Sequence, residues 1–228
     1  MLSAIAIVPS APVLVPELAA GAAAELAELR QAALTAVGAL PARWVAVGVD
    51  RVDGVVAPDR RGTFAGYGVD VRVALGPAVD AEPAWLPLCA LVTGWLRGQV
   101  NPDARAEVRV YADTHDADTA LGAGRALRAE IDQASEPVGV LVVADGAHTL
   151  TASAPGGHDP ESIPAQEALD DALAAGDAAA LTRLRDGPVG RVGYQVLAGL
   201  TQTGPTTATE LYRGAPYGVG YFVGIWHP

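Results

Sequence analysis

The sequence contains no lysine, one cysteine and four histidines, and each shortage excludes a kind of chemistry. Cys89 stands alone, so an internal disulfide is impossible, and its presence gives no sign of an oxidising compartment. Five His and Cys residues in total exclude a zinc finger or a cysteine-rich metal cluster. Without lysine, the chain can form neither a lysine Schiff base nor a Walker-type phosphate loop.

Positive charge and long apolar runs are also scarce. Fifteen arginines face 26 acidic residues, giving a net charge of −11, so we expect no nucleic-acid binding. An apolar stretch covers residues 1–20, MLSAIAIVPSAPVLVPELAA. No positively charged residue precedes its apolar run and prolines interrupt it, which argues against a secretory signal. No uninterrupted run of about 18 apolar residues exists, so no membrane span is expected. We therefore predict a cytoplasmic protein.

What the sequence does contain is an alternation of apolar strands and helical segments. The predicted strands cover residues 2–8, 44–49, 69–74, 108–111, 138–144, 206–211 and 217–226. The predicted helices cover residues 16–40, 83–97, 116–134, 164–175, 178–185 and 190–200. The helix at 83–97 would start at Pro83 and bury an apolar face with Trp85, Leu88, Val92 and Trp95. This order predicts an α/β fold, a three-layer α/β/α arrangement with a largely parallel sheet, in a single domain over residues 1–228.

The last predicted strand has a face rich in glycine. Tyr217, Val219, Tyr221, Val223 and Ile225 alternate with Gly218, Gly220, Phe222, Gly224 and Trp226. A strand face lined by glycine indicates a close approach by a neighbouring backbone or by a ligand. Tight packing against a helix is the simpler interpretation.

Polar residues follow three buried strands, and these residues are the main candidates for a site. Ser10 follows the first strand, Asp50 ends the second, and Asp145 and His148 follow the strand at 138–144. Ligand sites of open α/β sheets lie beyond the carboxyl ends of the strands. If these strands are parallel neighbours, the four side chains meet at one edge. His148 is the best candidate for an acid or base, because imidazole titrates near neutral pH.

The other three histidines have simpler explanations. His158 lies in PGGHDP, where glycine and proline predict a turn. His115 lies in YADTHDAD, whose Asp and Thr residues fit a helix N-cap. His227 is the penultimate residue of the sequence. With so few histidines, an intact non-haem iron triad of two His and one carboxylate is not expected.

A Ser-His-Asp hydrolase is an alternative enzymatic interpretation. Ser10, His148 and either Asp50 or Asp145 are the required residue types. The sequence has no G-x-S-x-G nucleophile motif, however, so the signal is weak.

Three stretches carry a resemblance to a known family. PSAPVLVPEL, ADGAHTLTASAPGGHDP and GAPYGVGYFV come in order along the chain and resemble motifs of the LigB-type class III extradiol dioxygenase superfamily, which includes Memo-like proteins. The resemblance implies an α/β fold with a central mixed sheet and a site at one sheet edge. Active members use Fe(II) to open a catechol ring with O₂. It also implies a small aromatic or other small-molecule ligand and is compatible with a homo-oligomer.

The resemblance implies a retained acid–base histidine but altered iron ligands. His148 matches the family's acid–base histidine, and Asp145 precedes it in the same motif. The two iron-binding histidine positions carry Ser10 and Asp50. The carboxylate position falls at Gly214, with Glu210 four residues earlier. His158, Glu210 and Tyr217, which lie in or beside these motifs, complete the predicted binding pocket.

Two functions therefore follow from the sequence. The first is a dioxygenase-like enzyme whose usual Fe(II) catechol cleavage is lost or altered, because Ser and Asp would cost iron most of its affinity. The second is a non-catalytic binding or scaffold protein that keeps the pocket. We predict no resident metal or cofactor, although Fe(II) serves the active relatives.

Overall fold

The computed structural model describes residues 1–19, 21, 24–77 and 81–228, and a mixed sheet of seven strands forms its centre. The strand order is β3-β6-β2-β7-β1-β9-β8. Strands β1, β7, β2 and β6 run parallel, whereas β3, β9 and β8 each run antiparallel to a neighbour. The bounds are β1 Leu2–Val8, β2 Arg43–Asp50, β3 Gly54–Val56, β6 Arg105–Ala112, β7 Val138–Val143, β8 Thr207–Gly214 and β9 Tyr221–His227.

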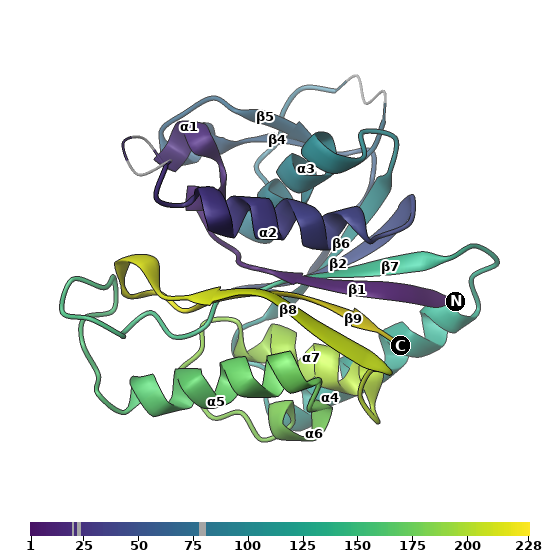
Figure 1. The fold of residues 1–228 in the computed structure, drawn as a ribbon. Helices are drawn as coiled ribbons and strands as arrows, with labels where there is room; N and C mark the ends of the chain where they lie inside the picture. Colours follow the sequence, from purple (N-terminus) through teal and green to yellow (C-terminus); the bar gives the residue numbers. More distant parts are fainter. Residues whose placement is uncertain (20, 22–23, 78–80) are drawn as a thin grey trace.

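Helices cover both faces of this sheet (Figure 1). On one face lie α1 (Pro16–Ala19), α2 (Ala27–Gly38) and α3 (Leu88–Val100), with the hairpin of β4 (Arg61–Thr63) and β5 (Arg72–Ala74). On the other face lie α4 (Ala117–Asp132), α5 (Ser162–Ala175), α6 (Ala178–Leu181) and α7 (Arg191–Thr201). Short 3₁₀ turns span Pro12–Leu14 (η1), Phe64–Tyr67 (η3) and Pro216–Gly218 (η4). The predicted three-layer α/β/α fold with a largely parallel mixed sheet is confirmed.

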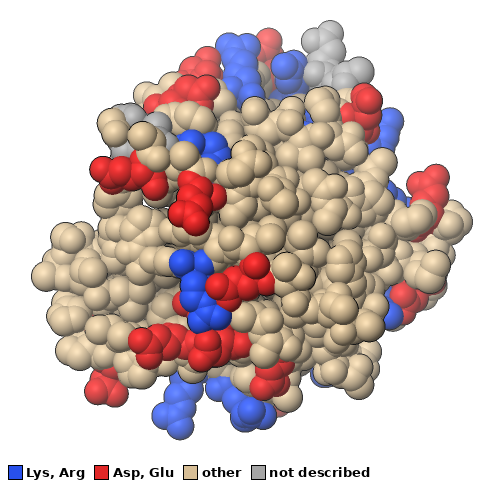
Figure 2. All heavy atoms as spheres, viewed as in Figure 1, with Lys and Arg blue, Asp and Glu red and all other residues tan. Residues whose placement is uncertain are grey.

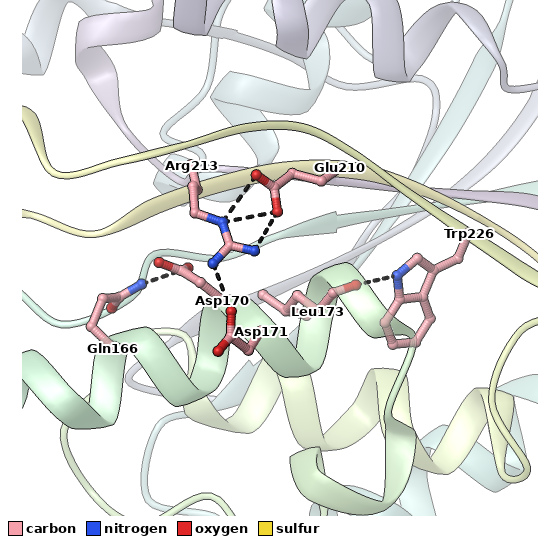
Figure 3. Close-up of polar contacts among 7 residues, drawn as sticks. All are labelled: Gln166, Asp170, Asp171, Leu173, Glu210, Arg213 and Trp226. Atoms are coloured by element: carbon pink, nitrogen blue, oxygen red, sulfur yellow. Dashed lines mark hydrogen bonds and ion pairs between the residues drawn. The ribbon is translucent and has the colours of Figure 1, made fainter.

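The apolar central strands supply both cores because their side chains alternate between the two faces. In β1, Ala6 and Val8 enter the core beneath α2 and α3, whereas Ile5 and Ile7 enter the core on the α4 and α7 face. Strand β9 continues this alternation. Its Val223 faces the first core, and the buried Trp226 faces the second and donates its indole N–H to Leu173 O of α5 at 2.8 Å (Figure 3).

The prediction of one continuous helix over residues 16–40 was wrong. The structure has α1 at Pro16–Ala19 and α2 at Ala27–Gly38, and the described residues 24–26 between them form a turn. Residues 20 and 22–23, which that prediction also covered, lie outside the described residues. The apolar spacing that supported a helix belongs to α2, where Leu29, Ala33 and Val37 are buried.

The helix predicted at 83–97 begins later, and this changes the position of Trp85. Pro87 takes the N-cap of α3, so the helix runs from Leu88 to Val100. Proline disfavours helical backbone in the residue before it, which explains why residues up to Leu86 stay outside. Trp85 is therefore not on the buried helix face but 82% exposed.

The final strand also starts later than predicted. Residues 216–218 form η4, in which Tyr217 has a φ of 61°, and β9 begins at Tyr221. Gly220 lies directly against the side chain of Gln166 in α5, where a Cβ atom would come within 2.3 Å. The expectation of tight packing against a helix thus holds at this glycine.

The side of the molecule seen in Figure 1 carries scattered charges rather than one charged field. Figure 2 shows wide uncharged areas, with acidic and basic groups next to one another near the centre. Within the described parts of the chain, no helix combines the length and apolar character needed to span a membrane.

Candidate functional site

A cleft of about 1130 Å³ opens at the carboxyl ends of the parallel strands. Its walls include the residues that follow β1, β2, β6 and β7, together with the first residues of α7. In open α/β sheets the crevice beyond the carboxyl strand ends is where ligands bind. Position alone therefore makes this cleft the candidate site.

The structure brings four predicted site residues into this cleft: Ser10, Asp50, Asp145 and His148 all line it. The reason is the strand order, in which β7 lies between β1 and β2 and runs parallel to both. The polar residues after these three strands therefore meet at one edge. The structure confirms that these four residues lie at the same edge of the sheet.

Asp145 has the most altered acid–base properties in the cleft. Its Oδ1 accepts a hydrogen bond from the Ser10 backbone N–H at 2.8 Å. Desolvation by the surrounding protein outweighs this bond and raises the pKa of Asp145 to about 7. Near neutral pH the carboxyl group is therefore present in both protonation states. Such a group can accept or donate a proton without a large energetic cost.

His148 lines the cleft with Asp145, three residues along the chain, and Gly156 of the following loop packs against its imidazole. Its Nδ1 is buried, and no described residue gives it a hydrogen-bond partner. A buried polar atom without a partner costs about 1–3 kcal/mol, so its presence calls for an explanation. A water molecule or a bound ligand that hydrogen-bonds to Nδ1 would supply one.

Gly156 is the residue that lets the loop close over His148. A Cβ atom at this position would lie 2.6 Å from the imidazole Cδ2 and Nε2. We expect Gly156→Ala to displace the ring and to lower the free energy of unfolding by only about 1–2 kcal/mol. The His148 ring resonances in an NMR spectrum report the displacement. Gly66→Ala is the matched control, because a Cβ there meets open space. Unchanged His148 resonances in Gly156→Ala would contradict this packing.

The turn from Asp145 to His148 is held in place by hydrogen bonds from separate elements. Gly146 N–H donates to Gly220 O at 2.8 Å, and Gly220 N–H donates to Ala147 O at 2.8 Å. Ala147 N–H donates to the Gln166 side chain of α5 at 2.7 Å. Gly190 N–H, at the start of α7, donates to Asp145 O at 2.8 Å. The acid–base residues are therefore positioned on a fixed backbone rather than on a free loop.

Gln166 also joins this turn to an ion-pair cluster on β8. Its side-chain amide donates to Asp170 Oδ1 at 2.8 Å, and burial raises the pKa of Asp170 to about 6. Figure 3 shows Arg213 reaching from β8 toward α5 next to Asp170. Arg213 forms ion pairs with Asp171 at 2.8 Å and with Glu210 of its own strand.

Three predicted pocket residues do not line the cleft. His158 forms an isolated bridge with Leu150 within the covering loop. Glu210 lies on β8 and forms the ion pair with Arg213. Tyr217 is 46% exposed and donates its hydroxyl to Glu25 at 2.9 Å. The motifs that contain these residues are close to the site, but the side chains serve other contacts.

The remaining histidines, His115 and His227, lie outside the cleft lining. Asp116 caps α4 by accepting the Thr119 N–H at 2.8 Å, as the sequence indicated. His115 Nε2 lies 2.7 Å from Asp53 Oδ1. His227 is an exposed residue at the end of β9.

Exposed apolar residues of the cleft wall were not among the residues predicted from the sequence. Val52, Tyr67, Trp85 and Val189 line it and are exposed large apolar residues. The sequence places Trp85 on a buried helix face because Pro83 fits a first turn, whereas the helix starts only after Pro87.

Arg191 and Asp113 were also missed, and both lie in the cleft wall. The Arg191 guanidinium is fully engaged: it pairs with Asp186 at 3.2 Å, donates to Gln195 at 2.9 Å, and donates to the backbone carbonyls of Asp113 and His115. Its role is to tie the start of α7 to the residues after β6. No local sequence signal connects these two segments.

The residues that the resemblance compares with iron ligands have other contacts or lie apart from one another. Ser10 uses its backbone to bind Asp145, and Glu210 is held outside the cleft by Arg213. Across residues 1–19, 21, 24–77 and 81–228, no three His, Cys, Asp or Glu side chains gather closely enough to hold a metal ion. The donor set therefore does not fit Fe(II), which favours histidine nitrogen together with carboxylate.

Comparisons with known proteins support the fold and go no further. No family model matches the chain, and no curated protein matches it. Among solved structures, the chain is similar to the crystal structure of an uncharacterized protein, JW3007, from Escherichia coli K12, with 13% sequence identity and a TM-score of 0.61. The match covers 99% of this chain and 100% of that one. At this identity the similarity shows a shared three-layer fold.

Proposed function

We propose that this chain is a class III extradiol dioxygenase-like protein whose cleft binds a small molecule and exchanges protons with it, without the usual Fe(II) cleavage of catechols. The observation that carries the proposal is that Asp145 and His148 both line the cleft at the carboxyl ends of the strands. The three sequence motifs support the family, and the position of the cleft supports a ligand site.

The acid–base part of the proposal rests on Asp145. A group works best as a general acid or base when its pKa lies near the working pH. Burial brings the pKa of Asp145 to about 7, and His148 adds an imidazole from the same turn. Together they could take a proton from one atom of a bound molecule and return it to another.

The loss of iron chemistry rests on the donor set. Of the positions that resemble iron ligands, Ser10 offers a hydroxyl, Asp50 a carboxylate, and Glu210 lies elsewhere. We expect protein prepared anaerobically with Fe(II) to retain far less than one iron per chain and to open no catechol ring. Metal analysis and a spectroscopic ring-cleavage assay measure both. Stoichiometric iron with turnover would refute this part of the proposal.

Binding in the cleft can be tested independently of metals. In a ligand-observed NMR screen of small aromatic molecules, we expect ligands of the wild-type protein to bind at least tenfold more weakly to His148→Ala. His158→Ala is the matched control, since that histidine lies outside the cleft, and it should leave affinity unchanged. Ligands that bind both variants alike would place the site elsewhere.

A non-catalytic binding protein is the second candidate, and one observation favours it. A catalytic base is usually oriented by a third group, whereas no described residue forms a hydrogen bond with His148 Nδ1. Hydrogen–deuterium exchange at an acidic C–H of a bound ligand separates the two. Exchange that depends on Asp145 and His148 supports catalysis, and tight binding without exchange supports the binding protein.

A further inference from the structure

We infer that the cleft takes a small molecule that joins a flat apolar group to a cationic nitrogen, as an arylalkyl amine does. The inference rests on the proposed function, because it assumes that the cleft is a small-molecule site. Two independent features of the cleft wall carry it: an apolar rim and an excess of carboxylates.

The rim gathers four exposed apolar side chains around one opening. Trp85 is 82% exposed, Val52 71%, Val189 50% and Tyr67 46%, and all four line the cleft. The other three tryptophans of the chain are buried, so Trp85 is the exception that the core does not explain. Clustered exposed apolar residues around a concave site indicate an apolar ligand surface, and an indole offers a flat face for stacking.

Carboxylates dominate the polar part of the wall. Asp50, Asp113, Asp145 and Asp186 line the cleft, and the side chain of Asp113 forms no hydrogen bond or ion pair with a described residue. Arg191 pairs with Asp186, and its other guanidinium nitrogens donate to Gln195 and to backbone carbonyls, so it forms no ion pair with the remaining three carboxylates. Arg51 at the rim is the remaining arginine in the wall.

The wider charge distribution acts in the same direction. The chain carries a net charge of −11, so its field attracts cations and repels anions before contact. The positive end of α7 meets the cleft, but a helix terminus is equivalent to only about half a charge. It therefore leaves the wall with a negative balance. The negatively charged wall would therefore repel an aromatic molecule that carries a carboxylate.

Three probes of equal size and different charge test the inference: 2-phenylethylamine, 2-phenylethanol and phenylacetate. Dissociation constants at pH 7.5 come from ligand-observed NMR. We expect the amine to bind at least tenfold more tightly than phenylacetate, with the alcohol between them. Asp113→Asn should weaken the amine several-fold and leave the alcohol unchanged, and Trp85→Ala should weaken amine and alcohol alike.

Two controls keep the result specific to the cleft. Asp118→Asn removes the same charge from an exposed position on α4 and should change no dissociation constant. Ile163→Ala removes an exposed apolar side chain outside the cleft and should behave likewise. Phenylacetate binding as tightly as the amine would overturn the inference and leave the cleft a ligand site. Binding of none of the probes would also overturn it, and the iron and screening experiments would then decide the proposed function separately.

Discussion

Asp145→Asn is expected to stabilise the folded protein at alkaline pH and to remove its acid–base chemistry. Burial raises the pKa of this carboxyl group from 3.8 to about 7, so the folded state holds the proton more tightly than the unfolded state does. Stability is therefore lost as pH rises from about 4 to about 7, and the loss is complete above that window. Three pKa units correspond to about 4 kcal/mol. Because the folded protein relaxes around the charge, we expect Asn to recover about 2–4 kcal/mol at pH 8.

Urea unfolding at several pH values measures this effect. The difference in unfolding free energy between Asp145→Asn and the wild-type protein should be near zero at pH 4.5 and grow up to pH 7. Asp170 titrates in both proteins, so its contribution cancels. Asp118→Asn, which is exposed, should show no such dependence. A pH-independent difference for Asp145→Asn would mean that this carboxyl group titrates normally.

Gln166→Leu is expected to destabilise the fold and to loosen the turn that carries Asp145 and His148. The substitution leaves the buried Ala147 N–H without its acceptor and removes a hydrogen bond to Asp170. Each buried group left without a partner costs about 1–3 kcal/mol, so we expect a loss of about 2–4 kcal/mol. Leucine is branched where glutamine is straight, and Gly146 and Gly220 lie too close to accommodate it easily.

Thermal or urea unfolding measures the loss, and amide hydrogen exchange of Ala147 reports the turn. Gln133→Leu, at the exposed C-cap of α4, is the control and should stay within about 0.5 kcal/mol of the wild-type protein. Slow exchange of the Ala147 amide in Gln166→Leu would show that another group holds the turn.

The sequence predicted the buried elements well because their patterns are local. The strand at 138–143 is a continuous apolar run, and α4 carries its N-cap residue and its inward residues Leu127 and Ile131 at helical spacing. Helix starts near prolines were harder. Pro83 and Pro87 both fit a first turn, and only packing decides that α3 begins after the second.

The cleft residues that follow the parallel strands could be predicted, because neighbouring parallel strands end at the same edge of the sheet. Ser10, Asp50 and Asp145 follow strands that the sequence identifies, and parallel neighbours bring them together. Arg191 reaches the cleft because α7 packs across the sheet from the far end of the chain, and no local pattern contains that information. The same limit explains Glu210, which precedes the GAPYGVGYFV motif by four residues and pairs with Arg213 outside the cleft.

The position of β1 within the sheet has a consequence for how the chain is made. Strand β1 is synthesised before both of its neighbours in the sheet, which are β7 at Val138–Val143 and β9 at Tyr221–His227. Both edges of an almost wholly apolar strand therefore wait for partners more than 130 residues away. Pairings this distant in sequence close slowly, and open apolar edges invite association between chains. A strand whose carboxyl end forms part of the cleft is thus also a segment exposed to misassembly during synthesis.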